Sequence, residues 1–222
     1  MVGGGYALPH TQVLGSKNGE RFLLLDAILV ETVIAPTSLP SATGIAHPLD
    51  LAVVYWLREE DPTASFTLNR PPLPLQHHPG LGILRRAFRV VTGMAAGLGK
   101  DGVGSLPKFF HDAVIFHRSR LFLFLDGREQ GRFEAMVRDL RPLPLGDASL
   151  ALIGACVRDE RGAVVEWKPG LLVFPLSARL AAHFNSPQYA AAVAEGLAAA
   201  RFSFDEAAVA RTRALVGEAA GG

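Results

Sequence analysis

Residues 73–122 read LPLQHHPGLGILRRAFRVVTGMAAGLGKDGVGSLPKFFHDAVIFHRSRLF, and this stretch decides the fold. A short apolar segment leads into the glycine turn His77–Ile83, and apolar residues at helical spacing follow over residues 84–98. This spacing predicts an amphipathic helix. Glycines at the start of a helix let backbone amides face an anion, and the helix dipole favours negative charge there. The stretch therefore predicts a phosphate-sized site around Gly80 and Gly82.

Strands are predicted on both sides of this helix. Leu51–Leu57 is almost continuously apolar and rich in β-forming residues, which is typical of a strand covered on both faces. Ser65–Asn69 alternates in polarity, so we expect it to pair with Leu51–Leu57 as an antiparallel hairpin. After the helix, the pattern predicts a short helix beginning at Pro107 and a buried strand over Leu121–Leu125.

The N-terminal region carries a hairpin signal. Asn18-Gly19 separates Gln12–Leu14 from Phe22–Leu25, and Asn-Gly is typical of a tight turn between two strands. Residues 27–34 are compatible with either a strand or a helix, and the prolines that follow them predict a loop over residues 36–48.

The last third of the chain changes character. Leu150–Val157, Val164–Trp167 and Leu171–Leu176 predict a hairpin or a small meander. Ser186-Pro187 is a strong helix start, and Asp205 is placed to cap a second helix.

These elements predict an α/β (α+β) fold with a mixed, largely antiparallel central sheet flanked by helices and with a C-terminal helical pair. The predicted organisation is an α/β core over residues 1–145. A β-hairpin or meander and the C-terminal helices, over residues 146–222, are expected to pack on the same domain.

Bulk properties exclude several classes of function. The 222 residues carry a net charge of +1, so no electrostatic footprint for nucleic acid is present, and no apolar run is long enough to cross a membrane. The only cysteine, Cys156, lies in an apolar run and is expected to be a buried, inert thiol. With no secretory signal and no disulfide, a cytoplasmic location is expected. The oligomeric state is not indicated.

Two motifs resemble one enzyme family. His77-x-x-Gly80-x-Gly82, followed by an amphipathic helix, resembles the acyl-CoA pyrophosphate loop of the GNAT superfamily of N-acyltransferases, (Q/R)-x-x-G-x-(G/A). Residues 113–122, AVIFHRSRLF, resemble the next short helix of that superfamily, A-x-x-L-Y-x-x-x-G-F. The resemblance covers residues 73–122. The chain departs from the patterns at His77, at His117 and at Leu121, where the family has arginine or glutamine, tyrosine and glycine.

This resemblance implies transfer of an acyl group from acyl-CoA to the amine of a small molecule by direct attack, with no metal. The cofactor-binding residues that it implies are His77, Gly80, Leu81, Gly82, Ile83, Arg85 and Arg86. His117 stands where the family's tyrosine protonates the departing thiolate. A histidine can also do so, because its ordinary pKa is roughly 6.5. The base that deprotonates the amine is not identified, although Glu59, Glu60 and Asn69 lie near the predicted hairpin.

Other interpretations remain open. The chain could be a noncatalytic ligand-binding or sensor domain of the same build. It could also be a metal-dependent enzyme, for which the candidate ligands are His77, His78, His111, Asp112 and His117, although their spacing matches no known metal motif. A basic surface is a further candidate, but a solvated helix face explains the same charges; its residues are Arg85, Arg86, Arg89, Lys100, Lys108, Arg118 and Arg120.

Overall fold

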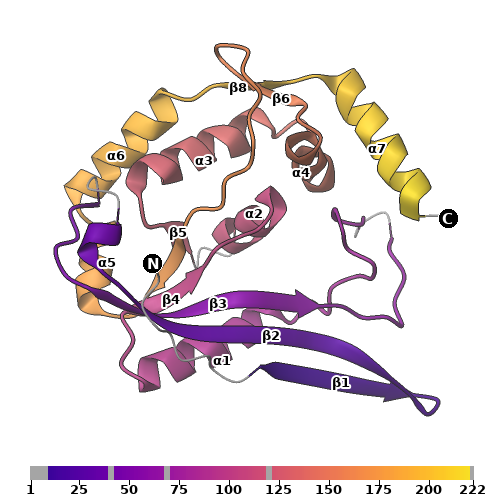
Figure 1. Cartoon of the computed structure of the whole chain (residues 1–222), viewed down its shortest axis with the longest axis horizontal. Coiled ribbons are helices and arrows are strands. Elements are labelled where there is room, and N and C mark those ends of the chain that lie inside the picture. The colour runs from indigo at the N-terminus through magenta and orange to yellow at the C-terminus, as the bar shows by residue number, and fades with distance from the viewer. Residues whose placement is uncertain (1–9, 40–42, 68–70, 119–121, 221–222) are drawn as a thin grey trace.

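The computed structural model describes residues 10–39, 43–67, 71–118 and 122–220. A six-stranded sheet runs through the molecule in the order β1-β2-β3-β4-β7-β5 (Figure 1). Neighbouring strands are antiparallel except β3 and β4, which are parallel. The predicted α/β fold with a mixed, largely antiparallel sheet and flanking helices is therefore confirmed.

The first three strands form an antiparallel meander. β1 (Thr11–Lys17) and β2 (Glu20–Ile34) are joined by Asn18-Gly19, whose φ angles of 53° and 85° suit a tight hairpin turn. The predicted hairpin is therefore confirmed, and the ambiguous residues 27–34 belong to β2. A 3-10 turn, η1 (Pro36–Ser38), lies in the predicted loop.

The third strand, β3 (Leu49–Glu59), pairs with β2 and not with the segment that follows it. Of the predicted partner Ser65–Asn69, the described residues 65–67 contribute only one bridge, at Thr67, and Asn69 lies outside the described residues. The predicted hairpin is thus wrong for the described part. The alternating polarity of residues 65–69 could not show that β2 of the N-terminal meander pairs with β3 instead.

A bulge marks the place where β3 leaves its parallel neighbour β4 (Gly102–Ser105). Val54 pairs with Leu29 and Trp56 pairs with Ile28, so Tyr55 has no partner in β2. β4 pairs with β3 only as far as Val54, after which β3 continues with β2 alone. β4 ends at Ser105, opposite Val54, and the bulge lies one residue further along β3, where it bends the strand and increases its local twist.

Two more strands complete the main sheet. β5 (Leu123–Phe124) pairs with β7 (Leu172–Pro175), and β7 lies between β5 and β4. A separate two-stranded sheet joins β6 (Val157–Asp159) to β8 (Phe202–Phe204).

The strand predicted to start at Leu150 is wrong, because α4 (Leu145–Ile153) occupies most of that range. This helix packs between α2 and α7 and buries residues 148–152 on all sides. A helix buried all round shows no polar face, so its periodicity could not distinguish it from a buried strand.

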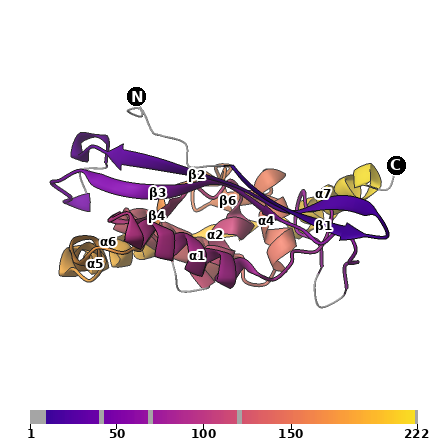
Figure 2. The same cartoon turned by 90° about the horizontal axis from the view of Figure 1, so that it is seen from below.

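Helices cover both faces of the sheet. α1 (Leu84–Gly97) and α2 (Phe110–Arg118) pack on the face that carries Ala52 and Val54, and Figure 2 shows α1 lying beneath the strands. α5 (Ala178–Phe184) packs on the opposite face.

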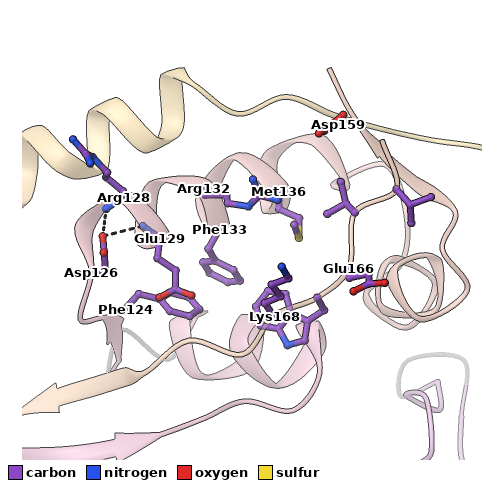
Figure 3. Close-up of a pocket in the computed structure, with 13 residues that line it drawn as sticks. Phe124, Asp126, Arg128, Glu129, Arg132, Phe133, Met136, Asp159, Glu166 and Lys168 are labelled. Atoms are coloured by element: carbon purple, nitrogen blue, oxygen red, sulfur yellow. Dashed lines mark hydrogen bonds between the residues drawn. The ribbon is translucent and has the colours of Figure 1, made fainter. Parts of the chain in front are cut away.

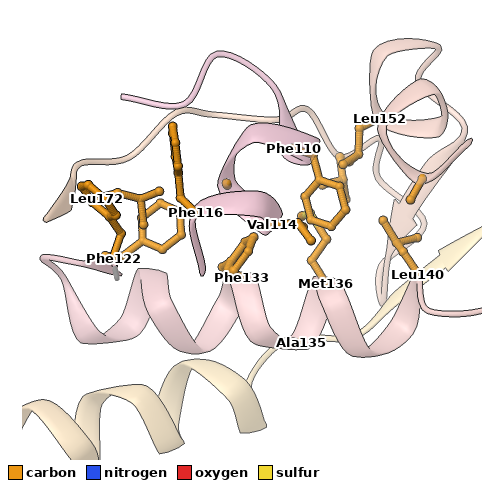
Figure 4. Close-up of a cluster of buried hydrophobic side chains, with 14 of the residues drawn as sticks. Phe110, Val114, Phe116, Phe122, Phe133, Ala135, Met136, Leu140, Leu152 and Leu172 are labelled. Carbon is orange, nitrogen blue, oxygen red and sulfur yellow. The ribbon is translucent and has the colours of Figure 1, made fainter. Parts of the chain in front are cut away.

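Aromatic rings hold α2 between α1 and α3 (Gly127–Asp139). The ring of Phe116 contacts that of Phe88 in α1, with 5.3 Å between centroids. Phe110 contacts Phe133 in α3 at 5.9 Å, and Figure 4 shows Phe110 and Val114 directed toward α3. Because burial of each such side chain contributes about 1.5–3 kcal/mol, these rings fix the position of α2.

The two C-terminal helices pack on different partners. α6 (Pro187–Ala198) lies along α3, whereas α7 (Glu206–Ala220) lies against α4. The predicted helix start at Ser186 is confirmed, since its hydroxyl accepts from the amide of Tyr189. The α3–α6 crossing depends on glycine, because a Cβ at Gly131 would lie 2.0 Å from the carbonyl oxygen of Val193.

Candidate functional site

The glycine loop lies beside the carboxyl end of β3. A Cβ built on Gly80 would lie 3.5 Å from Oε1 of Glu59, and the amide of Asp61 donates to the carbonyl of Pro79 at 2.8 Å. Gly82 has a φ of +71°, in the left-handed region that favours glycine. The loop and the end of β3 are therefore adjacent.

The start of α1 presents a run of backbone donors. No side chain caps this helix, and its first turn carries no acidic residue. Among the described residues, the amides of residues 81–85 have no hydrogen-bond acceptor, and the first amide of the helix that has one is that of Arg86, which donates to Ile83. Such amides, at the positive end of a helix dipole, are suited to an anion.

The charged side chains around the loop have opposite effects on a bound anion. Arg85 and Arg86 are exposed, and no ion pair forms on either within the described part of the chain. Glu59 places a carboxylate next to Gly80 and opposes a bound anion. Glu60, a candidate base, is mostly buried and pairs with Arg58 at 2.6 Å.

The two loop histidines do not act together. His77 is exposed, whereas His78 lines a cavity of about 180 Å³ together with Arg58 and Glu60. This smaller cavity lies on the β2 side of the loop, where Leu23 and Leu24 complete its wall.

His117 is directed toward α3. Nε2 of Gln130 donates to Nε2 of His117 at 3.1 Å, and the imidazole packs against the ring of Phe133 in a T-shaped arrangement, with 5.3 Å between ring centroids. Burial lowers the pKa of His117, and the carboxylate of Glu134 at 3.9 Å only partly opposes this. The preceding residue, Phe116, is the one that faces α1. Successive helical residues differ by roughly 100°, so the contacts of His117 place it on the α3 side of α2.

The candidate metal ligands do not converge. No three histidine, cysteine, aspartate or glutamate side chains form a metal-binding group in the described ranges, which include all five candidates. His111 is buried against α4, where its Nδ1 lies 2.8 Å from the hydroxyl of Ser149. Burial lowers the pKa of His111 and raises that of the adjacent Asp112. His111 and Asp112 lie 3.4 Å apart on α2, but His117 of the same helix contacts α3, and His77 and His78 lie in the glycine loop.

Two residues with other expected roles are buried. Lys100, a member of the candidate basic surface, is 9% exposed and forms ion pairs with Glu31 at 2.5 Å and Asp50 at 3.0 Å. It is therefore part of the interior and not of a surface. Arg120 lies outside the described residues. Cys156 is buried, as predicted.

The larger cavity lies elsewhere, between α3 and residues 159–168, and its volume is about 560 Å³ (Figure 3). Its apolar lining comes from Phe124, Phe133, Met136, Val164, Val165 and Trp167. The indole of Trp167 donates to the carbonyl of Pro107 at 3.0 Å, which ties this lining to the chain just after β4.

Glu129 is the most perturbed charged group of this cavity. Burial raises its pKa to about 7, the charge of Asp126 adds to this effect and Arg132 opposes it. A Cβ on Gly170 would lie 2.0 Å from Oε1 of Glu129, so glycine is what makes room for the carboxyl group. No partner within the described ranges bonds to or pairs with this carboxyl group. Sequence reasoning missed Glu129, because an acid in the first turn of a helix is ordinary.

Comparison with protein-family models, with curated proteins and with solved structures finds no match for this chain. In the described part of the chain, no helix combines the length and the apolarity needed to cross a membrane.

Proposed function

We propose that this protein is an acyl-CoA-dependent N-acyltransferase of GNAT-like build. The observation that carries the proposal is that β4 ends opposite Val54, whereas β3 continues past a bulge at Tyr55 to Glu59, beside the glycine loop. Where one strand of a parallel pair extends past the end of the other and a loop and helix connect the two, an extended ligand has a place beside the helix N-terminus.

The cofactor would use two kinds of backbone group. The amides of residues 81–85 suit its pyrophosphate, with Arg85 and Arg86 adding positive charge. Beyond Val54, β3 has no strand partner on its β4 side among the described residues, and such an edge can bond to an extended chain containing amides.

The reaction would be a direct transfer. The nitrogen of a neutral amine attacks the thioester carbonyl, the carbon–sulfur bond breaks, and the thiolate of coenzyme A takes up the proton that the amine loses. The products are an amide and free coenzyme A, so release of thiol measures turnover.

Binding of acetyl-CoA tests the proposal. A ligand that binds only the folded protein raises the melting temperature, by several degrees at a hundred times its Kd. We expect such a shift for the native chain and a loss of affinity of at least 30-fold in Gly82→Glu, whose side chain obstructs the loop and repels phosphate.

Gly19→Glu is the matched control, since Gly19 also has a positive φ, of +85°, and open space around it. Both substitutions impose similar backbone strain, and only Gly82→Glu should affect binding. The proposal fails if millimolar acetyl-CoA gives no shift, or if the two variants bind it equally.

A second candidate is a noncatalytic domain that binds acyl-CoA. It is favoured by the position of His117, whose described contacts lie on α3 and not at the loop. A chromogenic thiol assay separates the two candidates, and the buried Cys156 keeps the background low. Binding of acetyl-CoA without thiol release, across a panel of amines, would select the noncatalytic domain.

A further inference from the structure

The cavity under α3 contains charged groups that form no ion pair within the described part of the chain. Several charged groups in its lining have structural partners: Asp126 caps α3, Arg128 pairs with Glu195 at 3.0 Å, and Asp159 accepts from two amides of its own turn. The other charged groups of the lining are Glu129, Arg132, Glu166 and Lys168. No ion pair within 4.0 Å forms on any of these four in the described part of the chain.

These charges surround an apolar lining. Figure 3 shows Glu129 on one side of Phe133 and Lys168 on the other, with both side chains directed into the cavity. Arg132 lies one helical turn from Glu129 and opposes the rise in the pKa of Glu129. Its guanidinium also lies over the ring of Phe202, at 5.2 Å from the ring centroid. A negative group and positive groups thus flank aromatic surface in a space whose size is typical of small-molecule sites.

We propose that this cavity binds an α-amino acid with a large apolar side chain. The ammonium group would contact Glu129, the carboxylate would contact Arg132 and Lys168, and the side chain would lie on Trp167 and Met136.

A zwitterion fits the cavity better than a singly charged ligand. An ammonium group gives the half-buried carboxylate of Glu129 the partner that it lacks in the fold. A simple cation would leave Arg132 and Lys168 to repel it, and a simple anion would face Glu129. A ligand with both charges can pair with Glu129 and with Arg132 and Lys168 at once, and hydrogen bonds to charged partners are stronger than those between neutral groups.

This site requires no acyl-CoA. Only its use rests on the proposed function: if that holds, the bound α-amine is the acceptor. Binding of the amino acid and binding of acetyl-CoA are therefore measured separately, and either can fail without the other.

Three probes of similar shape test the site in calorimetric titrations of the full chain without coenzyme A. L-Phenylalanine carries both charges, 2-phenylethylamine lacks the carboxylate, and 3-phenylpropionate lacks the amine. We expect L-phenylalanine to bind about 10-fold to 100-fold more tightly than either of the others, as expected for the loss of one charge-assisted contact.

Substitutions test which residues bind the ammonium group of the ligand and which bind its carboxylate. Glu129→Gln should weaken L-phenylalanine at least 10-fold and should not weaken 3-phenylpropionate, whose carboxylate no longer faces a like charge. The double variant Arg132→Met/Lys168→Met should weaken L-phenylalanine equally and should not weaken 2-phenylethylamine, because the two like charges that oppose its ammonium group are gone. Glu206→Gln is the matched control, because Glu206 also occupies the first turn of a helix, α7, and is exposed outside the cavity.

Circular dichroism and melting curves confirm that each variant is folded before it is titrated. The proposal is overturned if L-phenylalanine does not bind at 10 mM, if the three probes bind equally, or if 3-phenylpropionate binds most tightly. Unchanged binding by Glu129→Gln, or an equal loss in Glu206→Gln, would also overturn it.

Discussion

The glycine loop before α1 consists mainly of backbone groups, whereas the cavity under α3 consists of side chains, although both lie at the same end of the strands of the sheet. The carboxyl ends of β3, β4 and β5 lie at this end of the sheet. The loop offers backbone amides from consecutive residues, with few side-chain contacts. The cavity is formed by side chains drawn from residues 124–168. A site made of backbone can be predicted from a short pattern, whereas a site made of distant side chains requires the fold.

The two regions also differ in packing, and glycine substitutions measure this difference. We expect Gly131→Ala to lower the free energy of unfolding by about 3 kcal/mol, because its Cβ would meet backbone atoms of α6. Gly93→Ala, in the exposed middle of α1 with nothing within 4 Å, should raise it by about 0.5–1 kcal/mol. Denaturant titration measures both, and equal stabilities would show that α3 and α6 are not closely packed.

Substitution of His117 tests whether this residue has a structural role at α3 or a catalytic role at the glycine loop. Its contacts with Gln130 and Phe133 indicate a structural role, so His117→Phe should cost about 1 kcal/mol of stability and leave kcat within twofold. His77→Phe, at an exposed loop position, should change neither. A 100-fold fall in kcat with KM unchanged would instead give His117 the proton-donating role that the resemblance implies.

Glu129 should make stability depend on pH. Its folded-state pKa of about 7 lies above its ordinary value of 4.5, so the folded state holds the proton more tightly and stability falls as pH rises from 4.5 to 7. Glu129→Gln should remove this loss. Relative to the native chain, the variant should gain on the order of 1 kcal/mol between pH 4.5 and pH 8, after allowance for solvent screening. Denaturant titrations at the two pH values measure this gain, and a constant difference would show that the carboxyl group is well solvated.

The smallest expected effect concerns Glu59. Its carboxylate lies next to Gly80 and opposes an anion, so Glu59→Gln should tighten acetyl-CoA binding about twofold to fivefold. Glu20→Gln, at the exposed start of β2, is the control. Weaker binding in Glu59→Gln would mean that the carboxylate supports the loop rather than opposing its ligand.

Local signals predicted much of the fold. The Asn18-Gly19 turn, the helix at residues 84–97 and the cap at Ser186 each depend on neighbouring residues, and all three are present. The predicted pairing of Ser65–Asn69 and the strand at Leu150 are wrong for the described residues, because strand partners and all-round burial are set by distant segments.

The candidate sites also differ in how far local sequence predicts them. The glycine turn and the start of α1 were predicted from a pattern of seven residues, His77–Ile83. The cavity was not predicted, because Glu129 lies in α3 whereas Trp167 and Gly170 lie much later in the chain, just before β7. Only the fold brings these residues together. Nothing at Glu129 itself distinguishes it from any acid at a helix start.

Hydrogen–deuterium exchange with and without coenzyme A tests most directly the claim that the amides before α1 hold the cofactor. In the free protein these amides lack acceptors among the described residues and should exchange quickly. We predict that coenzyme A slows exchange over residues 81–86 and leaves residues 126–133 of the cavity unchanged. Protection of the cavity in place of the loop, or no protection at either, would contradict the account.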